Sequence, residues 1–169
     1  MPGTSSIHEF LRGARVPYTL VPQRRAVTAQ EGAVATHVPG RNWAKVVICF
    51  IEGEPIEAVV PAPLTVNLAR LRELAGGREI RLAQENELGR PFPERGPAAM
   101  PPFGPHYGQS VFVDVALASE PEIIFNAGVQ GDAIAMRWAD FARSVRPIVG
   151  KFAEPPLNHV GAFRLSYRE

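Results

Sequence analysis

The sequence has a single cysteine, Cys49, and no long apolar run. One cysteine excludes an internal disulfide framework and a cysteine-based zinc site, and favours a reducing, intracellular compartment. No segment approaches the roughly 18 consecutive apolar residues that a membrane helix needs. The first residues lack a basic flank followed by an apolar core, so no secretory signal is expected. The net charge of +1 gives no general basic field, so any nucleic-acid contact must be local.

The composition is that of a folded globular domain. The 169 residues are 46% hydrophobic and 21% charged, and they include 17 prolines and 15 glycines, which predicts many tight turns and few long helices. Residues 150–169 show no clear periodicity. The expected organisation is one domain over 1–153, followed by a C-terminal tail over 154–169.

Local patterns predict helices and strands interspersed along the chain. Capping signals predict helices that begin at Ser6, Thr28 and Asn67, and a further helix is expected over 138–145. Apolar and β-branched runs predict strands over 16–21, 43–51, 56–60, 111–115, 123–127 and 133–136, with weaker signals for a strand over 80–82 and a helix over 85–88. Residues 89–108 read as a long loop rich in proline and glycine. The composite is an α/β domain.

Lys45 is one of only two lysines in the chain, and it begins an apolar strand. Alternation places it on one face with Cys49, while Ala44 and Ile48 lie on the other face. A buried ammonium without a partner is costly, so the side chain must reach water or meet an anion. Two interpretations follow: Lys45 extends to solvent at the strand end, or it is aimed into a cleft to hold a phosphate or an anionic transition state.

Two loops could present backbone groups beside such a cation. Residues 98–104 are apolar and stiffened by proline, and residues 126–128 end a buried strand in a glycine turn. The alternatives are a surface crossing for the first loop and a simple hairpin for the second. The sequence has no G-x-S-x-G elbow, P-loop or dinucleotide-binding fingerprint, so serine hydrolase, kinase and dehydrogenase functions lack support.

Several short motifs stand in one order along the chain. They are Val-Pro-Tyr-Thr at 16–19, Thr-Ala-Gln-Glu at 28–31, His-Val-Pro-Gly-Arg at 37–41, Ala-Lys-Val-Val at 44–47, Met-Pro-Pro-Phe-Gly at 100–104, Phe-Asn-Ala-Gly at 125–128, Asp-Phe at 140–141, Val-Arg-Pro at 145–147 and Gly-Lys-Phe-Ala at 150–153. Each is weak alone, but together, from about residue 5 to residue 153, they resemble the YbaK/prolyl-tRNA-editing family.

The resemblance implies a single α/β domain whose mixed β-sheet is partly closed like a barrel and surrounded by helices. It implies a stand-alone aminoacyl-tRNA deacylase that hydrolyses the ester between tRNA, chiefly tRNA for proline, and a wrong small amino acid. Such editing is needed because a synthetase pocket rejects similar amino acids by only a few kcal/mol. The implied partners are the 3′ end of an aminoacyl-tRNA and, as a second candidate, prolyl-tRNA synthetase. No cofactor, metal, DNA or membrane partner is expected, and the expected location is the cytoplasm.

The resemblance also implies a set of site residues. Lys45 matches the strand lysine that contacts the terminal adenosine or phosphate of the substrate, and is the candidate catalytic residue. The candidate substrate-binding residues are Ala98, Ala99, Met100, Pro101, Pro102, Asn126, Gly128 and Gln130.

Two of these positions depart from the pattern of the family. Ala98 stands where the substrate loop has glycine, and Gln130 stands where many relatives have histidine. A β-carbon at 98 should reshape the amino-acid pocket, and a glutamine cannot titrate as a histidine does. The alternative function is therefore a weak or inactive module that binds a tRNA 3′ end, a nucleotide or a synthetase. A fold-stabilising subunit with no ligand is a third possibility, which predicts that Lys45 and residues 98–104 tolerate substitution.

Overall fold

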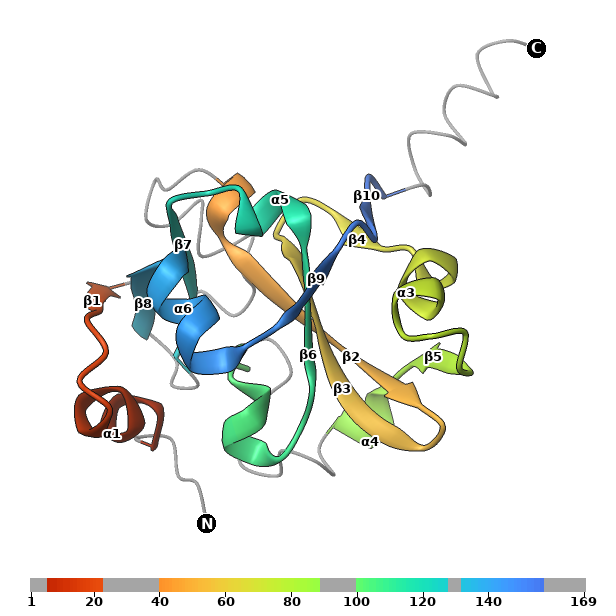
Figure 1. Ribbon diagram of the computed structural model, residues 1–169, viewed down its shortest axis with the longest axis horizontal. Coiled ribbons are helices and arrows are strands. Elements are labelled where there is room, and N and C mark those ends of the chain that lie inside the picture. The colour runs from red at the N-terminus through yellow and green to blue at the C-terminus, as the bar shows by residue number, and fades with distance from the viewer. Residues whose placement is uncertain (1–5, 23–39, 89–99, 128–131, 157–169) are drawn as a thin grey trace, which may run out of the picture.

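The computed structural model describes residues 6–22, 40–88, 100–127 and 132–156 (Figure 1). Its helices are α1 (Ser6–Gly13), η1 (Gly40–Asn42), α3 (Leu68–Leu74), α4 (Glu85–Leu88), η3 (Gly104–Tyr107), α5 (Val115–Ala118) and α6 (Trp138–Val145). Its strands are β1 (Thr19–Pro22), β2 (Ala44–Ile51), β3 (Glu54–Pro61), β4 (Thr65–Val66), β5 (Ile80–Leu82), β6 (Val111–Asp114), β7 (Glu122–Asn126), β8 (Asp132–Arg137), β9 (Ile148–Gly150) and β10 (Ala153–Glu154). The predicted α/β class is confirmed. None of the described helices is long and apolar enough to cross a membrane.

The strands of the described residues form three sheets. The largest has the order β5-β2-β3-β6-β9, in which β5, β2 and β3 are antiparallel neighbours and β6 and β9 are added in parallel. A three-stranded antiparallel sheet has the order β1-β8-β7, and β4 pairs with β10. Figure 1 shows the three-stranded sheet with α1 and α6 at one side of the molecule and α3 at the other. The described strands do not close into a barrel; an isolated parallel bridge from Trp43 to Ile124 joins the two larger sheets.

The strands predicted over 43–51 and 56–60 form the antiparallel β2–β3 hairpin. Its turn is Glu52–Gly53, with φ of 50° and 87°, so both residues are in the left-handed region. Two such residues match a two-residue turn to the twist of the strands. The turn sets Ile51 opposite Glu54, and the pairing continues to Ala44 opposite Pro61.

Helix α3 also has the predicted ends. The Asn67 side chain accepts a hydrogen bond from the Arg70 N–H at 3.0 Å, which satisfies a donor of the first turn. At the other end Gly76 and Gly77 both have positive φ, which glycine adopts without strain. Capping signals are local, and this helix could therefore be placed from sequence alone.

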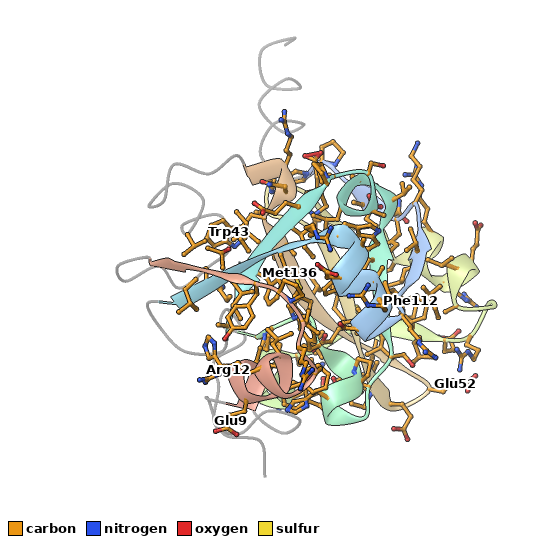
Figure 2. The ribbon with its side chains drawn as sticks, turned by 60° about the vertical axis from the view of Figure 1, so that its left-hand side comes forward. Glu9, Arg12, Trp43, Glu52, Phe112 and Met136 are labelled. Carbon is orange, nitrogen blue, oxygen red and sulfur yellow. The ribbon has the colours of Figure 1, made fainter. Side chains whose placement is uncertain are left out.

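Two cores lie on opposite faces of β2 and β3. The inter-sheet core consists of Ile7, Leu11, Val16, Ala44, Val59, Phe103, Val111, Val113, Leu117, Ile123, Phe125, Ala127, Ile134, Met136, Phe141 and Val145. The α3-side core consists of Cys49, Ile51, Ile56, Ala58, Val60, Leu71, Ala75, Phe112 and Phe152. Met136 and Phe112, labelled in Figure 2, belong to the first and second core respectively. The alternation predicted for residues 44–51 is thereby confirmed, and it decides which face Lys45 occupies.

Two predicted strands differ from the structure, and two further strands were not predicted. Strand β1 begins at Thr19 rather than at residue 16, after Pro17, which lacks the N–H that a strand ladder needs. The strand predicted over 111–115 ends at Asp114, because its carboxylate accepts the Ala116 N–H and starts α5. Strands β9 (Ile148–Gly150) and β10 (Ala153–Glu154) have no counterpart among the predicted elements, and β10 lies in the stretch without clear periodicity. The helix predicted from Thr28 lies outside the described residues.

Candidate functional site

Lys45 lies at the beginning of β2, on the face that also carries Cys49. Its side chain is half-buried, and Nζ donates a hydrogen bond to the carbonyl oxygen of Leu64 at 2.6 Å. Burial lowers the pKa of Lys45, because desolvation disfavours the charged form. Within the described residues no carboxylate pairs with this ammonium. A half-buried cation with one neutral acceptor keeps further N–H donors for an anion.

The acceptor carbonyl is held by the turn between β3 and β4. Leu64 donates its N–H to the Pro61 carbonyl at 2.9 Å, and Ala62 donates to the Trp43 carbonyl at 2.8 Å. Pro61 and Pro63 restrict the backbone dihedral φ on either side of Ala62. The position of the Lys45 ammonium is therefore set by main-chain geometry, and no side-chain signal in the sequence points to Leu64.

Asn126 ends β7 at the same end of the site. The parallel bridge joins Trp43 to Ile124, and Lys45 and Asn126 each lie two residues further along their strands. Trp43 and Ile124 belong to one buried cluster, and Ala44 and Phe125 both belong to the inter-sheet core. Asn126 is buried, with 6% of its surface exposed. The bridge therefore places Lys45 and Asn126 on neighbouring segments; Gly128 and Gln130, which follow Asn126, lie outside the described residues.

Trp43, which is labelled in Figure 2, lies two residues before Lys45 and was not singled out from the sequence. Its side chain is fully buried in a cluster with Ala62, Ala133 and Ala135. Its indole Nε1 has no hydrogen-bond partner in the described part of the chain, which is uncommon for a buried donor.

The loop residues Met100, Pro101 and Pro102 are all buried. Met100 packs against Ile48, with Val46 beside it. Because Val46 and Ile48 alternate with Lys45 along β2, the loop covers the face of β2 opposite to Lys45. Ala98 and Ala99, which precede Met100, lie outside the described residues.

Aromatic contacts fix the end of this loop. The Phe103 ring lies 5.4 Å from the Phe125 ring and 5.5 Å from the Phe141 ring, measured between centroids, and 6.1 Å from the Phe10 ring. Burying a side chain of this size stabilises the fold by roughly 1.5–3 kcal/mol. Phe125 directly precedes Asn126, so Phe103 connects the loop to the strand that carries Asn126.

The Lys45 face of β2 offers a fixed cation, whereas residues 100–102 lie on the opposite face of β2 and not beside the cation as the sequence led us to expect. Within the described residues there is no group of three or more histidine, cysteine, aspartate or glutamate side chains that could hold a metal ion. Cys49 is buried, and burial raises its pKa to about 12, which disfavours the nucleophilic thiolate. The chemistry available here is therefore binding of an anion and electrostatic stabilisation.

Comparisons with known proteins identify related chains. Residues 23–144 match the family described as the aminoacyl-tRNA editing domain, and no curated protein matches significantly. A hypothetical protein has the same fold, with a TM-score of 0.78, 19% identity, and coverage of 88% of this chain and 99% of that one. A protein proposed to be a trans-editing enzyme for prolyl-tRNA synthetase gives a TM-score of 0.75, 16% identity, and coverage of 91% and 99%.

A third structure places the same fold inside a longer chain. It is a protein from Marinobacter aquaeolei VT8 proposed to act in signal transduction, with a TM-score of 0.67 and 16% identity. The match covers 96% of this chain and 35% of that chain. At these identities the likeness to the solved structures shows the fold alone.

Proposed function

This chain belongs to the aminoacyl-tRNA editing domain family, and from that premise we propose that it hydrolyses the ester of a mischarged aminoacyl-tRNA. The proposed substrate is tRNA for proline that carries a wrong small amino acid. The neighbour proposed as a trans-editing enzyme for prolyl-tRNA synthetase supports this choice of tRNA, and makes that synthetase a candidate partner.

The observation that carries the proposal is the Lys45 ammonium. It is half-buried, its pKa is lowered by burial, and its acceptor is the neutral carbonyl of Leu64. A positive charge in a partly desolvated position interacts with an anion more strongly than one in water. We assign Lys45 to the terminal adenosine of the tRNA or its phosphate, which fixes the ester beside Asn126.

The reaction needs no protein nucleophile. Water attacks the carbonyl carbon of the ester, the bond from that carbon to the ribose oxygen breaks, and a proton from the water passes to the ribose oxygen. The products are the free amino acid and a tRNA with a free terminal hydroxyl. Holding the ester in place and stabilising the developing negative charge are sufficient for such a step.

The amino-acid pocket is assigned to the two loops. Met100, Pro101 and Pro102 line it from one side, with Ala98 and Ala99 preceding them, while Asn126, Gly128 and Gln130 line it from the other. A methyl group at Ala98 in place of the family's glycine narrows the pocket, which favours a small amino acid.

The proposal is tested by the rate at which tRNA for proline loses alanine, cysteine, serine or proline. The expected result is faster loss of at least one wrong amino acid and no faster loss of proline. Lys45→Ala should lower kcat/KM by about 100-fold, a typical cost of removing one fixed donor to a bound or developing anion. Lys151→Ala is the matched control, because Lys151 is the other lysine and is exposed.

Equal losses in the two lysine variants, or no loss in Lys45→Ala, would contradict the assignment of Lys45. If none of the four esters is hydrolysed faster while charged tRNA still binds, the chain is a binding module. The salt concentration must be held constant throughout, because a chain of net charge +1 binds tRNA by local contacts that salt weakens.

A further inference from the structure

Glu57 is a completely buried carboxyl group in the middle of β3. Neither of its oxygens has a hydrogen bond of good geometry within the described residues. The backbone N–H of Gly104 lies near enough to lower the pKa of the carboxyl, so this contact is a weak electrostatic one and not a well-formed hydrogen bond. Leaving a buried polar group this poorly satisfied is costly, and its retention calls for a role.

The loop that begins at Met100 lies directly over this carboxyl. Glu57 stands opposite Ile48 in the β2–β3 pairing, and Ile48 is the residue on which Met100 packs. On its other side Glu57 stands beside Val111 of β6, and its own N–H donates to the Ser110 carbonyl at 3.0 Å. Glu57 therefore pairs with β6, the strand that follows the loop, and its side chain lies on the face of the sheet that Met100 covers.

Gly104 is held tightly against this part of β6. A β-carbon at Gly104 would lie 2.6 Å from the Gln109 carbonyl oxygen and 2.6 Å from Val111 Cγ2. The Gln109 N–H donates to the Gly104 carbonyl at 2.8 Å. Gly104 is thus fixed in place beside Val111, the residue of β6 that pairs with Glu57.

The surroundings of the carboxyl favour its neutral form. Burial is the dominant influence and raises the pKa of Glu57 well above its ordinary value of 4.5, and the Gly104 N–H opposes this only in part. The titratable groups on the elements packed against this face are His106 and Tyr107 on η3 and Arg81 on β5. The Arg81 guanidinium lies over the Phe50 ring and is paired with Glu87 at 2.7 Å. A protonated carboxyl keeps a carbonyl oxygen that attracts the Gly104 N–H, without the cost of burying a charge.

We propose that Glu57 is a positioning residue: its buried carboxyl attracts the Gly104 N–H and so helps to hold the Met100–Gly104 segment in its substrate-binding arrangement. The proposal rests on the proposed function, because the segment lines an amino-acid pocket only if the chain is a deacylase. Glu57 touches no reacting atom; it acts through the loop. The binding of tRNA through Lys45, on the opposite face of β2, should be independent of it.

The test compares two substitutions at this position. Glu57→Gln keeps the shape and an acceptor oxygen while staying neutral, and should keep kcat and KM within about twofold of the parent chain. Glu57→Met removes the acceptor, and should lower kcat by about tenfold while leaving KM unchanged, since tRNA binding is intact. Asp114→Asn is the control: it weakens another buried carboxyl, away from the loop, and should lower the melting temperature without changing kcat.

A second readout follows the loop directly. Amide hydrogen exchange at Gln109, whose N–H donates to Gly104, should be faster in Glu57→Met by about tenfold and unchanged in Glu57→Gln. Exchange in the β7–β8 hairpin should be unaffected in both. As the pH rises above about 4.5 through the folded-state pKa, the parent chain should lose stability relative to Glu57→Gln, because only the parent must bury a charge or keep its proton.

Each result decides between the alternatives. Unchanged kcat and loop exchange in Glu57→Met would show that Glu57 only fills space, and equal defects in Glu57→Gln would show that an ionised carboxylate is required; both overturn the proposal. If Glu57→Met does not fold, Glu57→Gln decides alone. Normal activity, normal exchange at Gln109 and a weaker pH dependence of stability in Glu57→Gln support the proposal, and the loss of any of these results overturns it. If the parent chain hydrolyses no ester, the proposed function fails, while the exchange at Gln109 still decides whether Glu57 positions the loop.

Discussion

Replacing Asp114 by alanine should be among the most destabilising single changes in this chain. The Asp114 carboxylate is buried, with 3% of the residue exposed. One oxygen accepts the N–H groups of Phe152 at 2.8 Å and Ala153 at 2.7 Å, and the other accepts that of Ala116 at 2.9 Å. Asp114 therefore begins α5 and also ties the C-terminal strand β10 to β6.

The magnitude follows from these three hydrogen bonds. A hydrogen bond to a charged group contributes about 1.5–3 kcal/mol, and three that share one carboxylate are not additive. Loss of the helix cap alone costs about 0.5–2 kcal/mol. Allowing for some replacement by water, we expect Asp114→Ala to lower the free energy of unfolding by about 3–5 kcal/mol, and Asp114→Asn, which keeps one acceptor oxygen, by about half as much.

The assay is equilibrium unfolding in urea, with the exposed Glu122→Gln as the control. The Phe152→Ala variant adds a second check. Phe152 is fully buried in the α3-side core and is positioned by Asp114, so the double variant should lose less stability than the two single losses combined. A loss below about 1 kcal/mol in Asp114→Ala, typical of a surface substitution, would refute the argument.

Two further changes test other parts of the structure. Gly104→Ala should lower the free energy of unfolding by about 1–3 kcal/mol, because its β-carbon would lie 2.6 Å from the Gln109 carbonyl oxygen; an unchanged melting temperature would show that the loop is looser than described. Asp140 is buried, and its hydrogen bond from Arg137, together with Arg143, lowers its pKa below 3.8. Its stabilising contribution is therefore present above that ordinary value and is lost as the pH falls through the folded-state pKa. The stabilities of the parent chain and of Asp140→Asn, followed by denaturant unfolding at several pH values, should converge at low pH; a constant difference would contradict this.

Elements with local signals could be predicted from the sequence, and elements made by distant contacts could not. The β2–β3 hairpin and α3 have their turn and capping residues within the element itself. Strand β9 has only three residues, and pairs in parallel with β6, where Val113 stands beside Val149. Such a strand gains its stability from a partner more than thirty residues away, and no short-range pattern records that. Helix α5 was missed for a similar reason, since Asp114 both ends a strand and begins a helix.

The candidate site was predictable to the extent that charge and composition mark it. Lys45 could be singled out because a lysine is rare in this chain and rarer still in an apolar strand. The Leu64 carbonyl that holds it is a backbone atom, which no sequence signal identifies. Glu57 did leave a signal, a single acid inside the apolar run from Ile56 to Val60, but only the loop packed above it gives that acid a role.

Strand β2 connects the two halves of the site, because it carries Lys45 on one face and supports Met100 through Ile48 on the other. Its pairing with β3 places Val60 opposite Lys45 and Glu57 opposite Ile48. Since side chains alternate with a period of two, a slip of one residue would turn Lys45 into the inter-sheet core and break both halves at once. The register that the tight turn of the hairpin sets is therefore a requirement of the proposed activity as well as of the fold.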